Sequence, residues 1–359
     1  MAIAAEFPDI DTLWSLRGPI AGFQHHRGIT HTFVGIPFEA ALLLGGLMLL
    51  HHLRVRRSKA GSGAETSSSL PIIKAPVRWA LLYGCLVFAL LSHILLDYTN
   101  NYGVRPFFPF DPHWYAGSIV FIFDPLLFLL LLAGLLLPSL FGLIAGEVGA
   151  RRQTFRGAGW ARAALLFTLS YWSFRAFQHQ RATSLAAVQT LEAPAIDAEG
   201  APDAADGSGA SDQPAPMLVR PKLTAEHVLA SPDPISPFRW YTAADYGPVY
   251  QLGTADTLAG SLESGELLHK PALSSQLHAA ELTYLGRVYL DWSMMPWIST
   301  ERTGLSGTQK DVTVTFQDVR FMGASPLLHR DGKVPLSGQV IVGPDGSILD
   351  ESMDGRSGR

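Results

Sequence analysis

The sequence has one cysteine and few charged residues. Cys85 alone cannot form an intrachain disulfide or a cysteine-based zinc site, so any metal ion must be held by histidine, aspartate or glutamate. Only 16% of the 359 residues are charged, against roughly 25% in an average soluble protein. The formal net charge of −4 provides no basic surface for nucleic acid, and we expect no nucleic-acid partner.

Hydrophobic runs replace the missing charge in the first half of the chain. They fill residues 33–178, whereas residues 179–359 have the Gly, Pro, Asp and Ser content of a soluble region. A membrane-spanning helix needs about 20 apolar residues, and these runs lack the polar face of helices in a soluble bundle. We expect about four transmembrane helices: Ile36–Leu53, Val77–Leu96, Ser118–Ala145 and Ala158–Phe177. The fourth is also compatible with an amphipathic helix on the membrane surface, because it contains Arg162 and Arg175.

Lysine and arginine alternate between scarce and abundant from one connecting segment to the next. The segments after spans one and three hold ten: Arg54, Arg56, Arg57, Lys59, Lys74, Arg78, Arg151, Arg152, Arg156 and Arg162. The N-terminal segment and the segment after span two hold three: Arg17, Arg27 and Arg105. Basic residues accumulate in cytoplasmic loops. We therefore expect a multi-pass protein of the bacterial inner membrane whose N-terminus and C-terminal half lie on the periplasmic or external side.

Histidines and aspartates gather at the outer ends of the expected spans. His93 and Asp97 are four residues apart and share one helical face. The expected topology brings six more residues to the same membrane boundary: Asp9, Asp11, His25, His26, His31 and Asp124. Imidazole and carboxylate groups suit Zn²⁺, Mn²⁺ and Fe²⁺, and a catalytic site needs about three of them plus an open position for water. The pattern predicts a divalent-metal site, with Zn²⁺ as the first choice and Mn²⁺ or Fe²⁺ as alternatives.

Taken singly, these residues also have structural interpretations. Aspartates at such places are typical of turns and helix caps, and histidines of interfacial anchors or hydrogen bonds between helices. Asp124 precedes Pro125, the arrangement of an N-cap followed by proline at the first helical position. Glu39, two residues after Pro37, is placed to complement a helix N-terminus. The metal interpretation depends on the shared location, because ionisable groups at a membrane boundary are costly and tend to be functional.

The second half of the chain is expected to begin with a linker and to fold as a small α+β domain. Residues 182–216 are rich in Ala, Gly, Pro, Ser and acidic residues and contain too little apolar surface to fold. Strand-like runs follow at residues 238–241, 249–252, 312–316, 319–322 and 339–342, with a helix expected over Ala279–Trp297. The expected parts are an N-terminal metal-motif segment (1–32), a transmembrane helical domain (33–181), the linker (182–216) and the soluble domain (217–359).

Three motifs resemble a known family in their order along the chain. PDID, HRGITHT and SHILLDYTNNYGVRPFFPF, with a downstream aspartate in an apolar helix, are similar to the YdjM-like family of membrane-bound metal-dependent hydrolases, also described as LexA-binding and inner-membrane-associated. The resemblance covers about residues 5–180. It implies metal ligands among the aspartates and histidines of the motifs: Asp9, Asp11, His26, His31, His93 and Asp97.

The chain departs from that family at its start. Members usually have a Met-Asp-x-x-Thr-His segment and an apolar helix ahead of the PD-x-D motif, whereas this chain begins almost at the motif. We expect either a start placed too far downstream, which would omit a ligand and a span, or a shortened variant.

These observations favour a metal-dependent hydrolase with its site at the outer membrane boundary. We expect His26, His31, His93 and Asp97 as ligands, Asp9 or Asp11 as additional ligands, and Asp11 or Asp124 as the proton acceptor. A site at the headgroup level suggests a phosphoester or lipid-linked substrate, as does a distant similarity to zinc-dependent phospholipase C and P1-type nucleases. One alternative is a non-catalytic scaffold with a structural metal site and a partner-binding C-terminal domain. A transporter is another, although the spans show no internal repeat.

Overall fold

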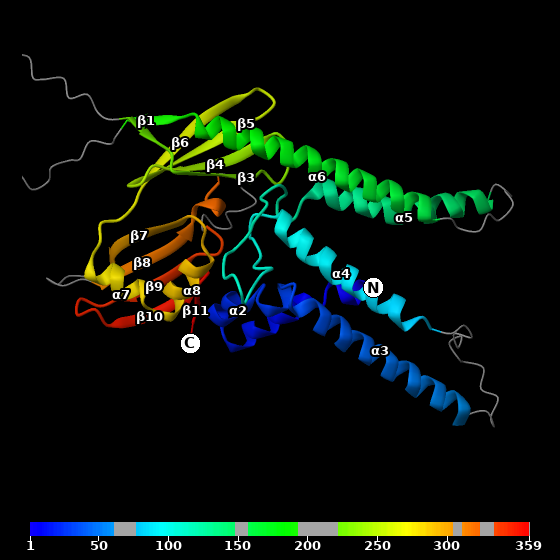
Figure 1. Ribbon diagram of the computed structural model, residues 1–359. Coiled ribbons are helices and arrows are strands. Elements are labelled where there is room, and N and C mark those ends of the chain that lie inside the picture. Colours follow the sequence, from blue (N-terminus) through cyan, green and yellow to red (C-terminus); the bar gives the residue numbers. More distant parts are fainter. Residues whose placement is uncertain (61–76, 148–156, 193–221, 304–310, 324–333, 359) are drawn as a thin grey trace, which may run out of the picture.

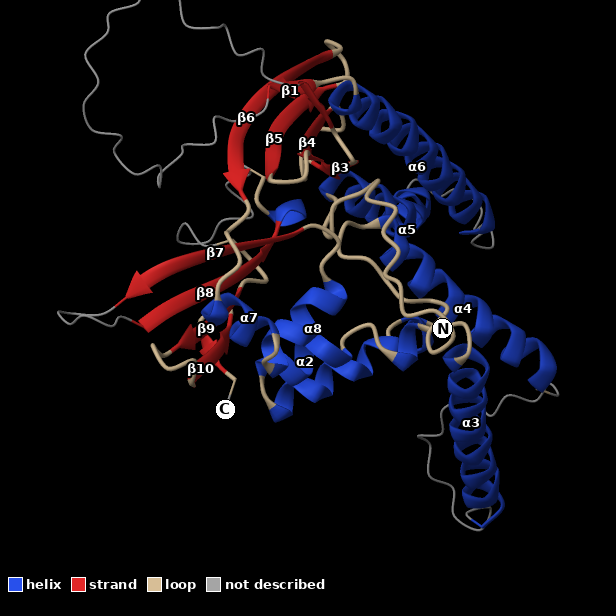
Figure 2. Ribbon diagram, turned by 60° about the vertical axis from the view of Figure 1, so that its left-hand side comes forward, coloured by secondary structure: helices blue, strands red, loops and turns tan. Residues whose placement is uncertain are grey.

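The computed structural model describes residues 1–60, 77–147, 157–192, 222–303, 311–323 and 334–358 (Figure 1). Helices make up the first half, and two antiparallel sheets make up most of the second. Figure 2 shows the long helices extending to one side of the molecule and the two sheets lying on the other. The expected division into a helical N-terminal region and a separate C-terminal domain is therefore present, and that domain is β-rich.

Four short elements form the N-terminal segment: α1 (Ala2–Ala5), the 3₁₀-helix η1 (Pro8–Arg17), α2 (Pro19–His25) and the 3₁₀-turn η2 (Ile29–His31). Proline stands at the start of both η1 and α2, where its fixed φ suits the first helical position and its missing N–H is not needed. Gly18 separates the two at φ 122°, a backbone conformation that favours glycine. The segment thus changes direction within a few residues and folds across the ends of the long helices.

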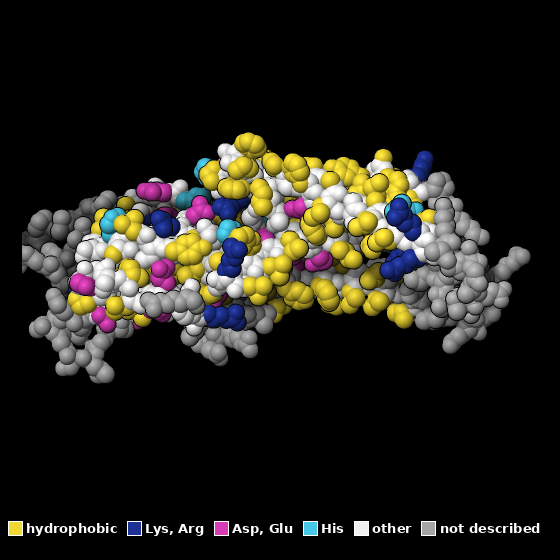
Figure 3. Space-filling view, turned by 90° about the horizontal axis from the view of Figure 1, so that it is seen from below, with side chains coloured by type: hydrophobic (Ala, Val, Ile, Leu, Met, Phe, Trp, Pro, Cys, Tyr) yellow, Lys and Arg dark blue, Asp and Glu magenta, His cyan; other side chains and the backbone are white. Residues whose placement is uncertain are grey.

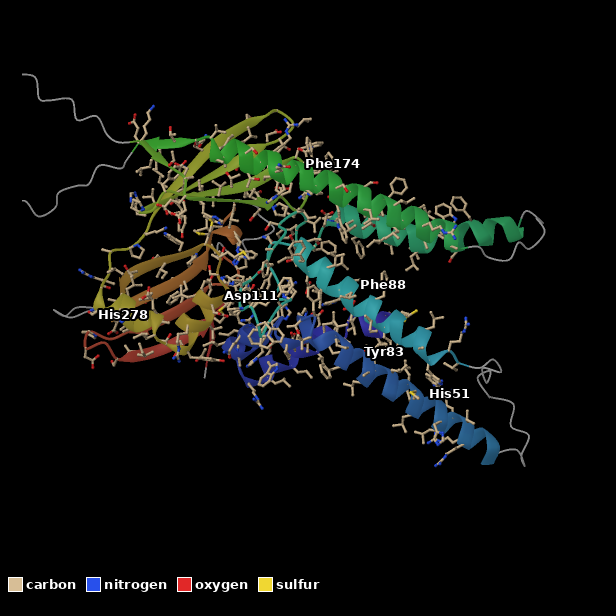
Figure 4. The ribbon with its side chains drawn as sticks, viewed as in Figure 1. His51, Tyr83, Phe88, Asp111, Phe174 and His278 are labelled. Carbon is tan, nitrogen blue, oxygen red and sulfur yellow. The ribbon has the colours of Figure 1, made fainter. Side chains whose placement is uncertain are left out.

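Two long helices satisfy the length and hydropathy of a membrane span. These are residues Gly35–Arg57 of α3 (Gly35–Ala60) and α4 (Trp79–Thr99), which pack side by side. Small and branched side chains, including Ala40 and Leu90, fill the contact between them, whereas Phe88 on α4 is 72% exposed (Figure 4). Seen from below, hydrophobic side chains cover this half, and lysine and arginine stand near its far end (Figure 3). This distribution matches a helix pair surrounded by lipid.

The structure differs from the prediction at the third and fourth expected spans. Helix α5 (Pro125–Glu147) begins at Pro125 rather than at Ser118, because Asp124 accepts a hydrogen bond from the backbone N–H of Leu127 and caps the helix. Among the residues whose side chains are described, its apolar stretch is Pro125–Phe141, which is too short to count as a span, while the helix itself continues to Glu147. Helix α6 (Gly157–Ala187) packs along α5 but continues past the expected end at Phe177. Length and hydropathy therefore identify two candidate spans in the described residues, and four are not established by this criterion.

The C-terminal domain contains two antiparallel meanders and a small ribbon. The first sheet has the order β3 (His227–Pro232), β4 (Arg239–Asp245), β5 (Val249–Asp256), β6 (Ser261–His269). The second has the order β11 (Arg356–Ser357), β10 (Ile348–Met353), β9 (Gly338–Val342), β8 (Asp311–Asp318), β7 (Pro296–Thr303). The ribbon pairs β1 (Thr190–Glu192) with β2 (Lys222–Thr224). The end of α6 covers the first sheet, where Ala182 packs against the buried Trp240.

Two expected elements of this domain are wrong in type or extent. Residues 319–322 do not form a strand: Val319–Phe321 is the 3₁₀-turn η3, because the Asp318 carboxylate caps it through the backbone N–H of Arg320. The single helix expected over Ala279–Trp297 is two helices, α7 (Ser275–Glu281) and α8 (Tyr284–Trp292). Thr283 separates them by capping α8, its hydroxyl accepting from the backbone N–H of Gly286.

The expected linker lies mostly outside the described residues. Within residues 182–192, α6 continues to Ala187 and β1 follows, while residues 193–221 are not described. Trp240 and Trp292 of the C-terminal domain both lie in core clusters.

The two halves of the chain share a hydrophobic core. Ile20 and Phe23 of α2, with Tyr102 from the loop after α4, belong to the same buried cluster as Tyr289 and Trp292 of α8. The ring centroids of Phe23 and Trp292 are 4.9 Å apart. The C-terminal domain therefore packs directly on the segment that carries the PDID and HRGITH motifs.

Candidate metal centre

Three segments far apart in sequence bring histidine and aspartate together where α4 ends. Asp9 lies on η1, His31 on η2, and His93 and Asp97 occupy the last two turns of α4. His93 and Asp97 share one helical face, as their spacing predicts. Gly28 permits the tight turn between α2 and η2, because a Cβ at this position would lie 2.8 Å from the carbonyl oxygen of His25. The HRGITH motif thus places His31 over the end of α4.

Four ligand atoms from these residues face one another: Asp9 Oδ1, His31 Nε2, His93 Nε2 and Asp97 Oδ2. His31 Nε2 lies 3.4 Å from Asp9 Oδ1, 3.3 Å from Asp97 Oδ2 and 3.2 Å from His93 Nε2. His93 Nε2 lies 3.5 Å from each of the two carboxylate oxygens. A regular tetrahedron of ligands roughly 2.0–2.2 Å from Zn²⁺ has edges of about 3.3–3.6 Å. These five separations match the edge lengths of such a tetrahedron, and Asp9, His31 and His93 form a group that could hold a metal ion.

Two features of this cluster are costly for a protein without a cation. Two imidazole nitrogens face each other at 3.2 Å, so at least one of them must carry a proton unless a cation lies between them. Asp97 Oδ2 is buried and accepts no hydrogen bond among the described residues, and its contacts are the ring nitrogens of His31 and His93, at 3.3 and 3.5 Å. A buried carboxylate oxygen carries a desolvation penalty unless one of these nitrogens is protonated or a cation is bound. A divalent ion at the centre of the four atoms would satisfy both, so the donor set fits a metal.

The far side of the His31 ring is fixed by Asp11. His31 Nδ1 lies 3.1 Å from Asp11 Oδ2, which also accepts hydrogen bonds from the Thr30 hydroxyl and the backbone N–H of Arg27. A carboxylate on the second ring nitrogen is the usual partner of a metal-binding histidine, since it fixes the tautomer and the ring orientation. Asp11 is therefore placed to orient the His31 ring, and it also belongs, with Asp9 and His26, to a second group that could hold a metal ion.

Arg27 holds Asp97 in the same manner. Its guanidinium donates to Asp97 Oδ1 at 2.8 Å and to the carbonyl oxygen of Gly103 at 2.8 Å, and it stacks over the Tyr102 ring at 4.7 Å. On sequence alone Arg27 counted only as a basic residue of the N-terminal segment, and its backbone adopts a positive φ of 56°. The available signal was its place between His26 and His31, where a buried arginine would need a carboxylate partner.

Two other residues predicted from the sequence lie outside the four-atom cluster. His26 Nδ1 contacts Asp11 Oδ1 at 3.2 Å, and a second possible ligand group combines His26 with Asp9 and Asp11. The Asp124 carboxylate caps α5 and accepts a hydrogen bond from the Tyr171 hydroxyl at 2.8 Å. The structure therefore does not bring Asp124 to the cluster, and its capping interpretation agrees with the contacts. Glu39, on the first turns of α3, is buried with one oxygen that has no hydrogen-bond partner among the described residues.

Without a bound metal, the electrostatics of the cluster favour a protonated His31. Burial lowers the pKa of His31, but its contacts with Asp11, Asp9 and Asp97 outweigh burial and raise that pKa to about 10. His31 and His93 hold the pKa of Asp9 well below its usual range. Burial raises the pKa of Asp11, but His26 and His31 overcome that effect and lower it. At neutral pH and without a metal, His31 is therefore an imidazolium in contact with the ionised carboxylates of Asp9 and Asp11.

Metal binding is expected to release a proton from His31. Because the pKa of His31 is near 10 without metal, Zn²⁺ must displace its proton at pH 7, and affinity should fall as pH falls below about 10. Calorimetric Zn²⁺ titrations at pH 7, in buffers of different ionisation enthalpy, should show about one proton released. Asp11→Asn should reduce the release, since it removes a carboxylate that raises the His31 pKa. A release of zero in the unaltered protein would contradict the assignment of His31 Nε2 as a ligand.

Comparison with known proteins is consistent with these motifs. A family model described as YdjM inner membrane protein matches residues 1–182, about half of the chain. The uncharacterized protein YfhP of Bacillus subtilis (strain 168) is 26% identical over 137 residues, which make up 36% of this chain and 33% of YfhP. The match thus spans about a third of the length of that curated relative. No solved structure matches the chain significantly.

Proposed function

The chain belongs to the YdjM inner membrane protein family, and on that premise we propose that it is a membrane-bound hydrolase dependent on a divalent metal, with Zn²⁺ as the first candidate. The observation that carries the proposal is the four-atom cluster of Asp9, His31, His93 and Asp97. Its imidazole and carboxylate composition suits hydrolytic metal sites more than purely structural ones, which are usually rich in cysteine.

The unequal burial of the four ligands supports a catalytic site over a closed structural one. The side chain of His31 is fully buried and those of His93 and Asp97 are 12% and 14% exposed, whereas that of Asp9 is 40% exposed. A catalytic zinc site has three protein ligands and an open position. Three enclosed ligands with a fourth at the surface give solvent and substrate access from the Asp9 side.

Different residues of this chain would have different roles at such a site. A bound divalent ion would supply Lewis acidity and lower the pKa of a water ligand toward neutrality. Asp11 keeps the His31 ring in one orientation, and Arg27 does the same for the Asp97 carboxylate. Water can reach the cluster best from the side of Asp9, because this ligand extends from the exposed η1.

A phosphoester, free or lipid-linked, is the substrate class that we propose. The cluster lies at the end of α4, the boundary at which lipid headgroups meet water if α4 spans the bilayer. We expect detergent-purified protein to hydrolyse a phosphoester when loaded with Zn²⁺ or Mn²⁺, to lose this activity on chelation and to recover it when the ion returns. Soluble aryl phosphodiesters and long-chain lipid phosphates form the first panel. Metal retention with no turnover across the panel would favour the scaffold alternative.

We propose four spans and a C-terminal domain outside the cytoplasm. Exposed leucines on α5 and α6 support two further membrane helices, as do the basic residues of the segments after α3 and α5. Alkaline phosphatase, which is active only outside the cytoplasm, should be active when fused after residue 359 and inactive when fused within residues 61–76. Green fluorescent protein at the same positions should give the reverse pattern. An active phosphatase within residues 61–76 would overturn the orientation.

A further inference from the structure

The 3₁₀-helix η1 divides into rows of different chemistry. With three residues per turn, side chains at i, i+3 and i+6 lie one above another. Ile10, Leu13 and Leu16 form an apolar row that is 47%, 59% and 85% exposed. The next row consists of Asp11, Trp14 and Arg17. Its first side chain is a buried carboxylate beside the cluster, and its last is an exposed cation. A row of exposed large apolar side chains this close to the spans implies contact with something other than water.

A groove of about 550 Å³ runs along η1 and faces η2. Ile10, Leu13 and Ile29 supply most of its apolar lining. This volume lies within the roughly 300–1,000 Å³ typical of small-molecule sites. The groove also includes Asp11 and Thr30, the two residues that contact His31 Nδ1. It therefore begins beside the metal cluster.

The two ends of the groove face different surroundings. Ahead of η1, Ala4 packs in a buried cluster with Leu86 and Leu90 of α4, so this end adjoins a candidate span. At the other end, Gly18 follows Arg17 and lies against Gly358 of the C-terminal domain. The groove thus extends from the side of the apolar helices to the side of the β-rich domain.

The end near the C-terminal domain is cationic and aromatic. The rings of Trp14 and His25 stack with centroids 4.1 Å apart, and the Arg17 guanidinium lies 4.5 Å from the Trp14 ring centroid. A purely hydrocarbon ligand would gain nothing from a guanidinium. An anion with an attached chain matches both ends, because its charge meets Arg17 while its chain lies along Leu13 and Ile10 toward the helices.

We propose that this groove is a binding site for an anionic membrane lipid, with the hydrocarbon chain between η1 and η2 and the charged headgroup near Arg17. The inference goes beyond the proposed function and does not depend on it, because Arg17 lies at the end of the groove opposite Asp11 and the metal cluster. The apolar row of Ile10, Leu13 and Leu16 lies against the membrane and brings the groove to the depth of the lipid chains.

Photocrosslinking tests the groove without requiring turnover. The probes are phosphatidic acid with a diazirine in one acyl chain and the matching neutral diacylglycerol, each in mixed micelles with the full-length protein. We expect the phosphatidic acid to label η1 and η2. Filling the groove with Leu13→Trp or Ile29→Trp should reduce this labelling about tenfold. Leu16→Trp is the matched control, because Leu16 lies on the same row but does not line the groove.

Further comparisons separate this proposal from the proposed function. Arg17→Gln should reduce labelling by phosphatidic acid but not by diacylglycerol. Leu13→Trp should reduce labelling by both probes, because the indole fills the space that the hydrocarbon chain occupies. Labelling of η1 and η2 without any turnover would overturn the hydrolase and support the lipid site. Labelling spread evenly over α3–α6 and insensitive to Leu13→Trp would overturn the lipid site, even if soluble phosphoesters are hydrolysed.

Discussion

Replacing His31 with alanine should lower metal affinity roughly 100- to 1,000-fold, since apparent zinc-binding free energies of 10–16 kcal/mol are shared among about four ligands. His31 is fully buried and provides three of the five measured contacts among the four ligand atoms. His93→Ala and Asp97→Ala should have effects of the same size. Elemental mass spectrometry on protein purified in detergent measures the result directly, with about one equivalent expected in the unaltered protein.

The remaining substitutions should have smaller effects. Asp11→Asn leaves all four ligand atoms in place and should weaken binding about 10- to 100-fold, as is usual when the partner of a metal-binding histidine is lost. His278→Ala is the control, because His278 is 71% exposed on α7, far from the cluster (Figure 4). All variants should still insert in the membrane, since alanine at positions 93 and 97 makes α4 no less hydrophobic and α3 is unchanged. Full metal retention in both His93→Ala and Asp97→Ala would refute the ligand assignment.

Much of this site follows from helical spacing and from membrane topology. The i, i+4 interval predicts that His93 and Asp97 share a face, and the topology predicts that Asp9 and His31 lie at the same boundary. Sequence patterns could not separate neighbouring candidates, because His26 and His31, or Asp9 and Asp11, have the same chemistry a few residues apart. The three-residue turn of η1 separates Asp9 from Asp11, so one faces the four-atom cluster and the other faces His31 Nδ1. A 3₁₀-helix of this length is uncommon and has no sequence signature.

Tertiary packing decided the features that sequence reasoning did not find. Hydropathy predicts four apolar runs but not that α6 would leave its partner α5 and cover a sheet. The strand pattern of residues 319–322 is overridden by a side-chain cap from Asp318. Burial of Arg27 depends on the end of α4 and the loop that follows it, 70 to 76 residues further along the chain, where the Asp97 carboxylate and the Gly103 carbonyl oxygen accept its hydrogen bonds. Such contacts depend on how the two halves dock, which local pattern does not specify.

A buried ion pair contributes to that docking, together with the shared hydrophobic core. Asp318 and Arg320 are both almost completely buried and meet through paired hydrogen bonds of 2.8 Å. The Arg320 guanidinium also donates to the carbonyl oxygens of Asn101 and Tyr102, at 3.0 and 3.3 Å, and stacks on the Trp292 ring. Tyr102 in turn lies beneath the guanidinium of Arg27, which holds Asp97. A chain of contacts therefore connects the C-terminal domain to a ligand of the metal cluster.

Replacing Arg320 with alanine should destabilise the protein by about 3–5 kcal/mol, because the Asp318 charge remains buried without its partner. Burial raises the pKa of Asp318, but Arg320 outweighs burial and lowers it, so the stabilisation is present above the ordinary carboxyl pKa and is lost as pH falls below it. The deficit of the variant should therefore be largest at neutral pH and shrink below about pH 4. Guanidinium unfolding of the full chain, followed by tryptophan fluorescence, measures it.

A double substitution separates the effect of the Asp318–Arg320 pair on stability from its effect on zinc affinity. Asp318→Asn with Arg320→Met removes both charges and should recover much of the lost stability, since replacing a buried ion pair with uncharged side chains costs far less than breaking it. Zinc affinity should not recover to the same extent, because methionine cannot donate to the carbonyl oxygens of Asn101 and Tyr102. If stability and zinc affinity recovered together, the C-terminal domain would act only by its overall folding. Recovery of stability alone would show that Arg320 positions the loop on which Arg27, and through it Asp97, depends.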